Sequence, residues 1–400
     1  MPMFTFEGDI EGVSEPQKEF VGKVLEKHGF HGGTVVVSAV GNAGDNYVAN
    51  VKRLAIEKDG ETFKMVAKIA PIIENLRLMM NTKMMFSNEH VMYQVVLPKF
   101  TEMEKEAGIP VHERLRYAKC YGIFMLEPYE IILLEDLQVS NFVMLDRFKS
   151  LTDETVKLVL KNFAKLHSLS FALKNQEPET FERFRSLLSN MWDANAVQMQ
   201  GDFMLYFQQL ENDLLALVQS EREKKFIKGS LMKLPENFTK VAAVLKTSKY
   251  GVIQQGDSWT NNIMFTLDVS LFDYVLYYAL IYIASTSKHY QEWIDYYHNE
   301  LEKRLAEYNL KANLVYPRDQ LDLDLMRFGK TSFGLSLMLA TMLIKEHSEA
   351  AKFKDAMAEN NMDGLLESSK LSNMNVGTME RFKERLEGLI THFNELGYIR

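Results

Sequence analysis

The chain has 400 residues, of which 46% are hydrophobic and 25% charged, a composition typical of a globular protein with more than one core. A net charge of −8 disfavours nucleic acid, which calls for a basic surface, and no nucleic acid partner is expected, although a local basic patch could still hold a phosphorylated small molecule. Cys120 is the only cysteine, which excludes an intramolecular disulfide and fits a reducing, cytoplasmic location. No basic stretch followed by an apolar one opens the sequence, so no secretory signal is expected.

Residues 34–70 carry the pattern of β-strands. The β-branched run TVVVS comes first, followed by YVANVKRLAIE and FKMVAKIA. Asp59-Gly60 separates the last two runs and predicts a tight hairpin, because both residue types tolerate positive φ. In the second arm, side chains alternate between a more apolar face (Phe63, Met65, Ala67 and Ile69) and a less apolar one (Lys64, Val66 and Lys68). Lys68 is therefore expected to project away from the most apolar face.

A helix is predicted over residues 82–97, ending before Pro98. Its apolar stripe contains Met85, Met92 and Val96, and Glu89 falls on that stripe. A carboxylate on a buried face usually has a cationic partner, and Lys68 on the preceding strand would supply one.

The rest of the chain reads first as two more strands, YGIFML and IILLEDL, and then as helices. Thr152 is expected to cap a helix whose inner face carries His167 and Ser170. Residues 179–246 are helical in pattern, and the last helix is predicted over about 378–396 with Gly397 as its stop. His167 is interpreted as a core histidine, and no role is assigned to Cys120.

The run Tyr274–Ala284 contains eleven apolar or aromatic residues. It is too short to span a bilayer, so a buried core element is favoured over a membrane anchor, and no membrane partner is expected. Nothing in the sequence selects an oligomeric state.

The stretch QGDSWTNNIMF places Asp257 and Asn262 before a short predicted hairpin that ends at Asp273. Phosphoryl transfer needs a carboxylate to orient the attacking hydroxyl, and an amide oxygen and a second carboxylate to hold Mg²⁺. Upstream, Lys68 would reach the phosphates of ATP, and Gly41 and Gly44 in a loop would let backbone N–H groups approach them. The order of these parts, rather than any one of them, favours a kinase-type fold.

The same residues resemble the ecdysteroid kinase-like family, also described as CHK kinase-like, over nearly the whole chain. VAKIAP resembles its strand with the ATP-binding lysine, here Lys68, and FSNEHVMYQVVLPKF its helix with the paired glutamate, here Glu89. LLEDL, with Glu135 and Asp136, resembles the hinge that contacts adenine, and AGDNYVANV the glycine-loop segment with Gly44. QGDSWTNNIMF resembles the catalytic loop, with Asp257 as base and Asn262 as metal ligand.

This resemblance implies an α+β, bilobal, protein-kinase-like fold. Residues 1–134 would form a small β-rich ATP-binding lobe, residues 135–140 the hinge, and residues 141–400 a larger, mainly helical lobe. It also implies ATP-dependent phosphorylation of a hydroxyl on a small molecule such as a steroid, with Mg²⁺ held by Asn262 and Asp273.

The chain departs from the family pattern in two places. Gln255 replaces the histidine that usually precedes Gly-Asp, and the segment after Asp273 lacks the usual Ser-Pro loop and second Asp. A second hypothesis is therefore a catalytically impaired binding protein with the same fold. A third, an unrelated α+β scaffold, would require the order of the motifs to be coincidence.

Overall fold

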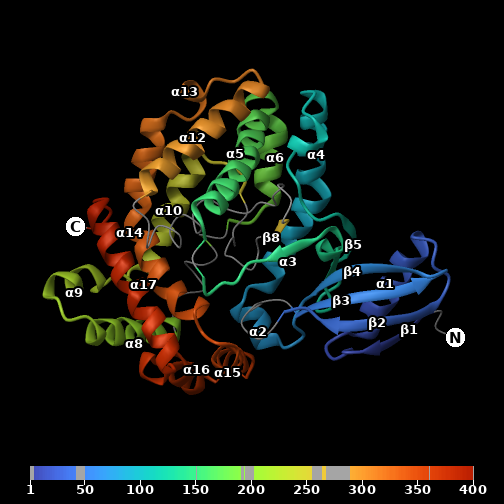
Figure 1. The fold of residues 1–400 in the computed structure, drawn as a ribbon, viewed down its shortest axis with the longest axis horizontal. Coiled ribbons are helices and arrows are strands. Elements are labelled where there is room, and N and C mark those ends of the chain that lie inside the picture. The colour runs from blue at the N-terminus through green and yellow to red at the C-terminus, as the bar shows by residue number, and fades with distance from the viewer. Residues whose placement is uncertain are drawn as a thin grey trace.

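The computed structural model describes residues 4–41, 50–149, 151–190, 193, 202–254, 264–266, 289–359 and 361–399. It has an α+β fold in which an N-terminal mixed sheet is followed by a mostly helical region (Figure 1). The predicted fold class is thus confirmed.

The N-terminal sheet has six strands in the order β1-β2-β3-β4-β6-β5. Their bounds are Phe4–Gly8 (β1), Gly33–Ala39 (β2), Asn50–Lys58 (β3), Glu61–Ile69 (β4), Cys120–Phe124 (β5) and Ile131–Glu135 (β6). β1 pairs with β2 in parallel, and the other neighbours are antiparallel. A parallel pair needs a crossover, which helix α1 (Glu15–Lys27) provides.

The β3–β4 hairpin turns at the predicted dipeptide. Asp59 and Gly60 both have positive φ, 54° and 83°. Along β4 the residues predicted for the apolar face become buried towards the end of the strand, while those of the other face stay partly exposed. Met65 and Ala67 pack with Val21 of α1 in one core. The opposite face of the sheet is therefore left for the helices that follow.

The helix predicted to end before Pro98 continues past it, so that boundary was wrong. α2 (Glu74–Met79) and α3 (Thr82–Val91) lead into a π-helical turn over Met92–Val96 and then into α4 (Leu97–Glu106). Pro98 lies just after the π turn in this unbroken run, so one backbone N–H is missing from the helical hydrogen bonds at that point. The π turn changes the hydrogen-bond spacing just before it, which lets one helix pass into the next.

The remaining elements are mainly helices. They are η2 (Val111–Glu113), η3 (Leu137–Ser140), β7 (Phe142–Met144), α5 (Asp153–Gln176), α6 (Pro178–Leu187), α8 (Asp202–Leu217), α9 (Glu221–Ile227), α10 (Leu234–Thr247), β8 (Met264–Thr266), α12 (Tyr290–Glu307), α13 (Ala312–Val315), α14 (Arg318–Leu343), α15 (His347–Ala358), α16 (Met362–Ser369), η5 (Leu371–Asn373) and α17 (Val376–Glu395). Thr152 caps α5 by accepting a hydrogen bond from Thr155 N at 3.2 Å. Gly397, with φ 73°, follows the end of α17 as predicted.

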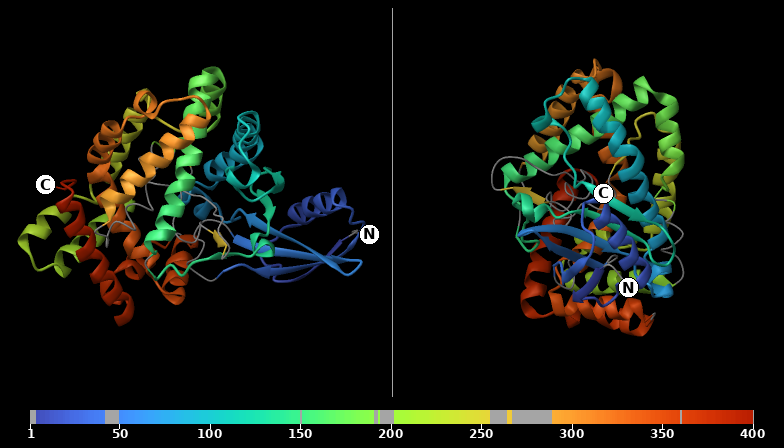
Figure 2. Two further views of the ribbon diagram at one scale, coloured as in Figure 1. Left: turned by 45° about the horizontal axis from the view of Figure 1, so that its top comes forward. Right: turned by 90° about the vertical axis from the view of Figure 1, so that its right-hand side faces the viewer.

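Helices from the first 134 residues pack onto the C-terminal helices. Leu76 of α2 belongs to the core formed by α8, α10 and α14–α17. Phe100 and Met103 of α4 pack with residues of α5 and α6. The sheet and the helical region lie at opposite ends of the molecule, with these helices between them (Figure 2). These contacts cross the predicted boundary at residue 134. The division of the chain at that residue stays a prediction.

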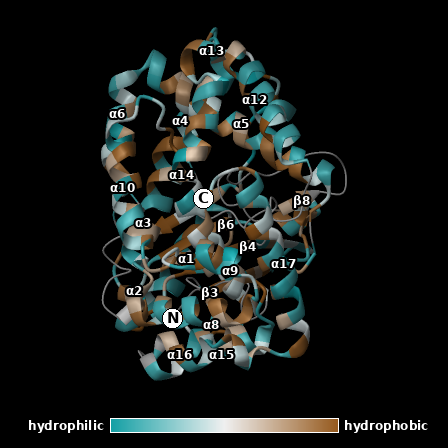
Figure 3. Cartoon of the chain, turned by 90° about the vertical axis from the view of Figure 1, so that its left-hand side faces the viewer, coloured by the Kyte–Doolittle hydropathy of each residue, from teal (hydrophilic) through white to brown (hydrophobic). Residues whose placement is uncertain are grey.

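Most helices are amphipathic, with hydrophobic and hydrophilic bands side by side (Figure 3). Within the described parts of the chain, no helix is both long and apolar enough to cross a membrane.

Candidate functional site

Lys68 and Glu89 form an ion pair between β4 and α3. The Lys68 ammonium donates to both carboxylate oxygens of Glu89, with Nζ–Oε1 and Nζ–Oε2 distances of 2.8 and 2.6 Å. The two side chains are 32% and 23% exposed, so the pair is open to solvent on one side. The structure thus brings these two predicted site residues together.

Packing explains why Glu89 meets the lysine. Phe86, one helical turn earlier, is buried against Ile132 and Leu134 on the face of the sheet opposite α1. Residues three apart on a helix share a face, so docking Phe86 turns Glu89 towards the sheet. Lys68 lies directly opposite Ile132 in the β4–β6 pairing and rises from that same face.

The predicted glycine loop begins after β2. Gly41 has φ 77°, a left-handed conformation that favours glycine. Just before it, Val40 N donates to Val51 O at 3.2 Å, which ties the start of the loop to β3. Gly44 lies outside the described residues.

Of the two predicted hinge residues, Glu135 is the last residue of β6 and lies opposite Met65, and Asp136 follows it. Lys119 N donates to Glu135 Oε2 at 3.1 Å. The Asp136 carboxylate is 3% exposed and accepts from Arg53 Nε at 2.6 Å and from Gln138 N at 3.2 Å. Both carboxylates are therefore bound to groups of the protein, and an adenine contact by their side chains stays a prediction.

Sequence reasoning missed Arg53. Alternation along β3 places it on the face that carries Lys68, next to the acidic Glu135-Asp136 motif in the folded sheet. That proximity depends on strand pairing across 83 positions, so no local pattern indicates it. A basic residue in a strand of the N-terminal sheet was the available signal.

The predicted catalytic residues Asp257, Asn262 and Asp273 lie outside the described residues, but the structure shows how α5 holds the chain before them. Lys174 Nζ donates to Lys249 O and Gly251 O at 2.8 and 3.1 Å. Ser170 Oγ accepts from Ile253 N at 2.7 Å. One face of α5 therefore fixes the path of residues 249–253.

Beyond the gap, β8 pairs antiparallel with β7, and Val143 lies opposite Phe265. Phe265 is buried in the core of α5 and α12. The strand predicted after Asn262 is thus present as residues 264–266.

The sequence profile of the ecdysteroid kinase-like family matches residues 43–310, which is more than half of the chain. The chain belongs to the ecdysteroid kinase-like family. No curated protein and no solved structure matches it. The matched region of this ecdysteroid kinase-like protein contains Lys68, Glu89, the predicted hinge and the predicted catalytic segment.

His167 lies in the core of this family member, as interpreted from the sequence. Its Nδ1 lies 2.8 Å from the Tyr297 hydroxyl, and burial lowers the pKa of the imidazole to about 4, so the ring is neutral. Nε2 has no hydrogen-bond partner among the described residues.

The Cys120 thiol is an unsuitable nucleophile in this kinase-like protein. Burial raises its pKa to about 11, so the thiolate is scarce at neutral pH.

The described residues contain no group of three or more His, Cys, Asp or Glu side chains arranged to hold a metal ion.

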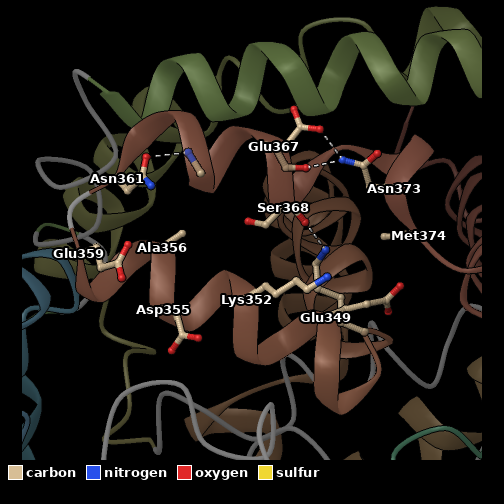
Figure 4. A pocket seen from close by; sticks show the side chains of 12 residues that line it. Glu349, Lys352, Asp355, Ala356, Glu359, Asn361, Glu367, Ser368, Asn373 and Met374 are labelled. Atoms are coloured by element: carbon tan, nitrogen blue, oxygen red, sulfur yellow. Dashed lines mark hydrogen bonds between the residues drawn. The ribbon is translucent and has the colours of Figure 1, made fainter.

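A polar cavity of about 580 Å³ lies between α15 and α16 (Figure 4). Two of its charged side chains hold the surrounding helices together. Lys345 Nζ donates to Ser368 O at 2.9 Å, near the end of α16, and Glu349 accepts from Asn375 N at 2.9 Å, ahead of α17. Bonds to the ends of the neighbouring helices therefore account for these two charged side chains.

Where the structure describes them, the large apolar side chains of the helical region 179–246 that could line an acceptor pocket pack in or against the core. Phe181 and Phe184 pack with α4 and α5, and Phe207 packs with the C-terminal helices. Met204 is only partly buried against that second core. Met191, Trp192 and Met199 lie outside the described residues.

Proposed function

We propose that this protein is an ATP-dependent kinase that phosphorylates a hydroxyl group of a small molecule. The observation that carries the proposal is the Lys68–Glu89 pair, held open on one face of the sheet in a chain of the ecdysteroid kinase-like family. Among the described residues the Lys68 ammonium bonds only to Glu89, and it has three N–H donors. One donor is left for a phosphate oxygen.

The pair fits a nucleotide in its charge and its setting. The ammonium is partly solvated, so binding a phosphate does not require breaking a buried contact. Glu89 fixes the position of the lysine ammonium, and the loop that starts at Gly41 leads to β3 on the same sheet. Glu135 and Asp136, the predicted hinge residues, lie at the end of β6 in that sheet.

By family resemblance, Asp257 would orient the acceptor hydroxyl and take its proton, and Asn262 and Asp273 would hold Mg²⁺. Mg²⁺-ATP supplies the transferable phosphoryl group and the charge that offsets the one developing on it. A steroid-like alcohol is the proposed acceptor class, and the cytoplasm is the proposed location.

The test uses the intact protein, and its first step requires no acceptor. At a nucleotide concentration a hundredfold above Kd, Mg-ATP should stabilise the protein by about 2.7 kcal/mol, visible as a rise in melting temperature. ATP consumption is then measured with a panel of ecdysteroids and other small alcohols. Asp257→Asn should keep the melting shift and lose at least about a hundredfold in turnover.

Lys64→Met is the control for a change on this surface, because Lys64 is an exposed lysine on the face of β4 that carries Lys68. It should keep both the shift and the turnover. The absence of any stabilisation by Mg-ATP would contradict the proposal.

The shortened segment after Asp273 favours a second candidate, a binding protein of the same fold without turnover. It predicts stabilisation by a steroid-like ligand, no ATP consumption with any alcohol, and no effect of Asp257→Asn.

A further inference from the structure

Arg53 projects from the face of the sheet that carries Lys68. In the β3–β4 pairing, Val51 lies opposite Lys68 and Arg53 lies opposite Val66. Directly opposed residues share a face, as do residues two apart along a strand. The guanidinium of Arg53 therefore stands on the proposed nucleotide-binding face, two residues further along β3 from the position opposite Lys68.

Arg53 is bonded to both sides of the turn after β6. Its Nε donates to Asp136 Oδ2 at 2.6 Å, and its Nη2 donates to Gln138 Oε1 at 2.6 Å. A longer contact of 3.4 Å joins Nη2 to Asp136 Oδ1. The two parallel contacts to one carboxylate fix the plane of the guanidinium as well as its distance.

Asp136 also shapes the backbone of the turn. Its Oδ1 accepts from Gln138 N at 3.2 Å and caps the 3₁₀ helix η3. Asn141, in the left-handed region with φ 61°, follows the end of that helix. The path of residues 136–141 is therefore set by one carboxylate, and that carboxylate is held by an arginine from another strand.

The side chains of Glu135 and Asp136 both accept hydrogen bonds from protein groups. Among the backbone groups, Glu135 N already donates to Lys119 O at 2.8 Å and Asp136 O accepts from Val139 N at 3.0 Å. The groups of the hinge best placed to read a purine are therefore its other backbone groups, such as the N–H groups of Asp136 and Leu137. Adenine and guanine present opposite donor and acceptor patterns on the edge that such groups contact. A backbone reader discriminates between them only if its donors and acceptors are held at fixed positions.

We propose that Arg53 and Asp136 are positioning residues that set the hinge backbone and thereby the preference of the nucleotide site for adenine over guanine. This inference rests on the proposed function, since it concerns the base of the same nucleotide. The pair acts through the hinge, and neither side chain needs to touch the base.

The experiment compares Mg-ATP and Mg-GTP on the intact protein, using the nucleotide concentration that gives half of the maximal melting shift. The variants are Arg53→Met, Arg53→Lys and Asp136→Asn, with Lys64→Met as the matched control on the same sheet face. Arg53→Met and Asp136→Asn should weaken the binding of Mg-ATP about tenfold and the binding of Mg-GTP much less, so the preference for ATP falls. Arg53→Lys should give an intermediate loss, because an ammonium cannot make the two parallel contacts. Lys64→Met should change the binding of neither nucleotide.

Gln138→Ala keeps the experiment decisive if Arg53→Met does not fold. It removes one acceptor of Arg53 and leaves the buried carboxylate paired, so a folded protein with a smaller loss of preference is expected.

The outcomes separate the two claims. A wild-type protein that binds neither nucleotide would overturn the proposed function. A wild-type protein that prefers ATP, with variants that keep that preference, would overturn only this inference. Equal weakening of both nucleotides would also overturn it, because a merely structural pair would lower the folded fraction without changing the choice of base.

Discussion

Two ion pairs in the N-terminal region have the same contact distance and different surroundings. Arg77 Nη2 lies 2.6 Å from Glu130 Oε1, and Lys68 Nζ lies 2.6 Å from Glu89 Oε2. The side chains of the first pair are 4% and 2% exposed, against 32% and 23% in the second. Distance alone therefore does not separate a structural pair from one that can serve a ligand.

The partners around each pair make the difference. Arg77 Nη1 also donates to Pro71 O at 3.1 Å, and Glu127 adds a second carboxylate at 3.3 Å from Nη2. The buried guanidinium is thus enclosed by acceptors of the protein. A site for a ligand needs a charge that is oriented and still incompletely satisfied, which describes Lys68.

Replacing Arg77 should have the largest effect on stability. Arg77→Met leaves the Glu130 carboxylate buried without its cation, and we expect the free energy of unfolding to fall by about 3–5 kcal/mol. Urea denaturation measures the change. In the double variant Arg77→Met/Glu130→Met much of the loss should return, because neither charge then remains buried. A loss under about 1 kcal/mol in the single variant would contradict the structural role.

Glu104 adds a third case to the comparison of the two ion pairs. Its carboxylate is buried, and it forms no ion pair within the described residues. Burial raises the pKa of its carboxyl to about 7, although Leu115 N donates to Oε1 at 2.6 Å and Lys165 and Arg114 oppose the shift. The folded state thus holds the proton more tightly than the unfolded chain, whose carboxyl has a pKa near 4.5.

Stability should therefore fall as the pH rises from about 4.5 to about 7, by about 3 kcal/mol at most. Glu104→Gln should flatten this part of the pH profile of unfolding. An unchanged slope in the variant would show that Glu104 does not titrate in this range.

Glu89→Gln tests the open pair. Because both side chains are partly exposed, the free energy of unfolding should change by no more than about 1 kcal/mol. The melting shift with Mg-ATP should nevertheless decrease, since the lysine loses the carboxylate that orients it. A large loss of stability with an unchanged Mg-ATP shift would reverse the distinction between the two pairs.

Glu127→Gln should have the smallest effect. Glu127 is 49% exposed, shares Arg77 with Glu130, and also pairs with the exposed Lys83. Solvent therefore screens both of its contacts. No measurable change in urea denaturation is expected, with Lys83→Met as the control at the same site. A clear destabilisation would mean that Arg77 depends on its outer partner as well.

Local patterns in the sequence predicted much of the N-terminal sheet. Alternation gave the orientation of Lys68, Asp59-Gly60 gave the hairpin, and helical spacing placed Glu89 towards the strand. These features depend on neighbouring residues, which is why one sequence suffices to find them.

Features that depend on distant residues were not predicted. The Arg53–Asp136 contact depends on the register of three strands, β3, β4 and β6. The continuation of the helix past Pro98 depends on a π turn, which the local sequence does not predict. The family profile agrees with the resemblance seen in the motifs, whereas the metal-binding and catalytic assignments stay predictions because they fall between residues 254 and 289.

The two adjacent residues Leu76 and Arg77 limit how this protein can be dissected. Leu76 is buried among the C-terminal helices, with Met79 and Met80 packed against the same core, while Arg77 is bonded to Glu130 beside the sheet. A fragment ending at residue 134 would present the three apolar side chains of Leu76, Met79 and Met80 to water and so tend to self-associate. The proposed binding of a nucleotide is therefore best tested in the intact chain.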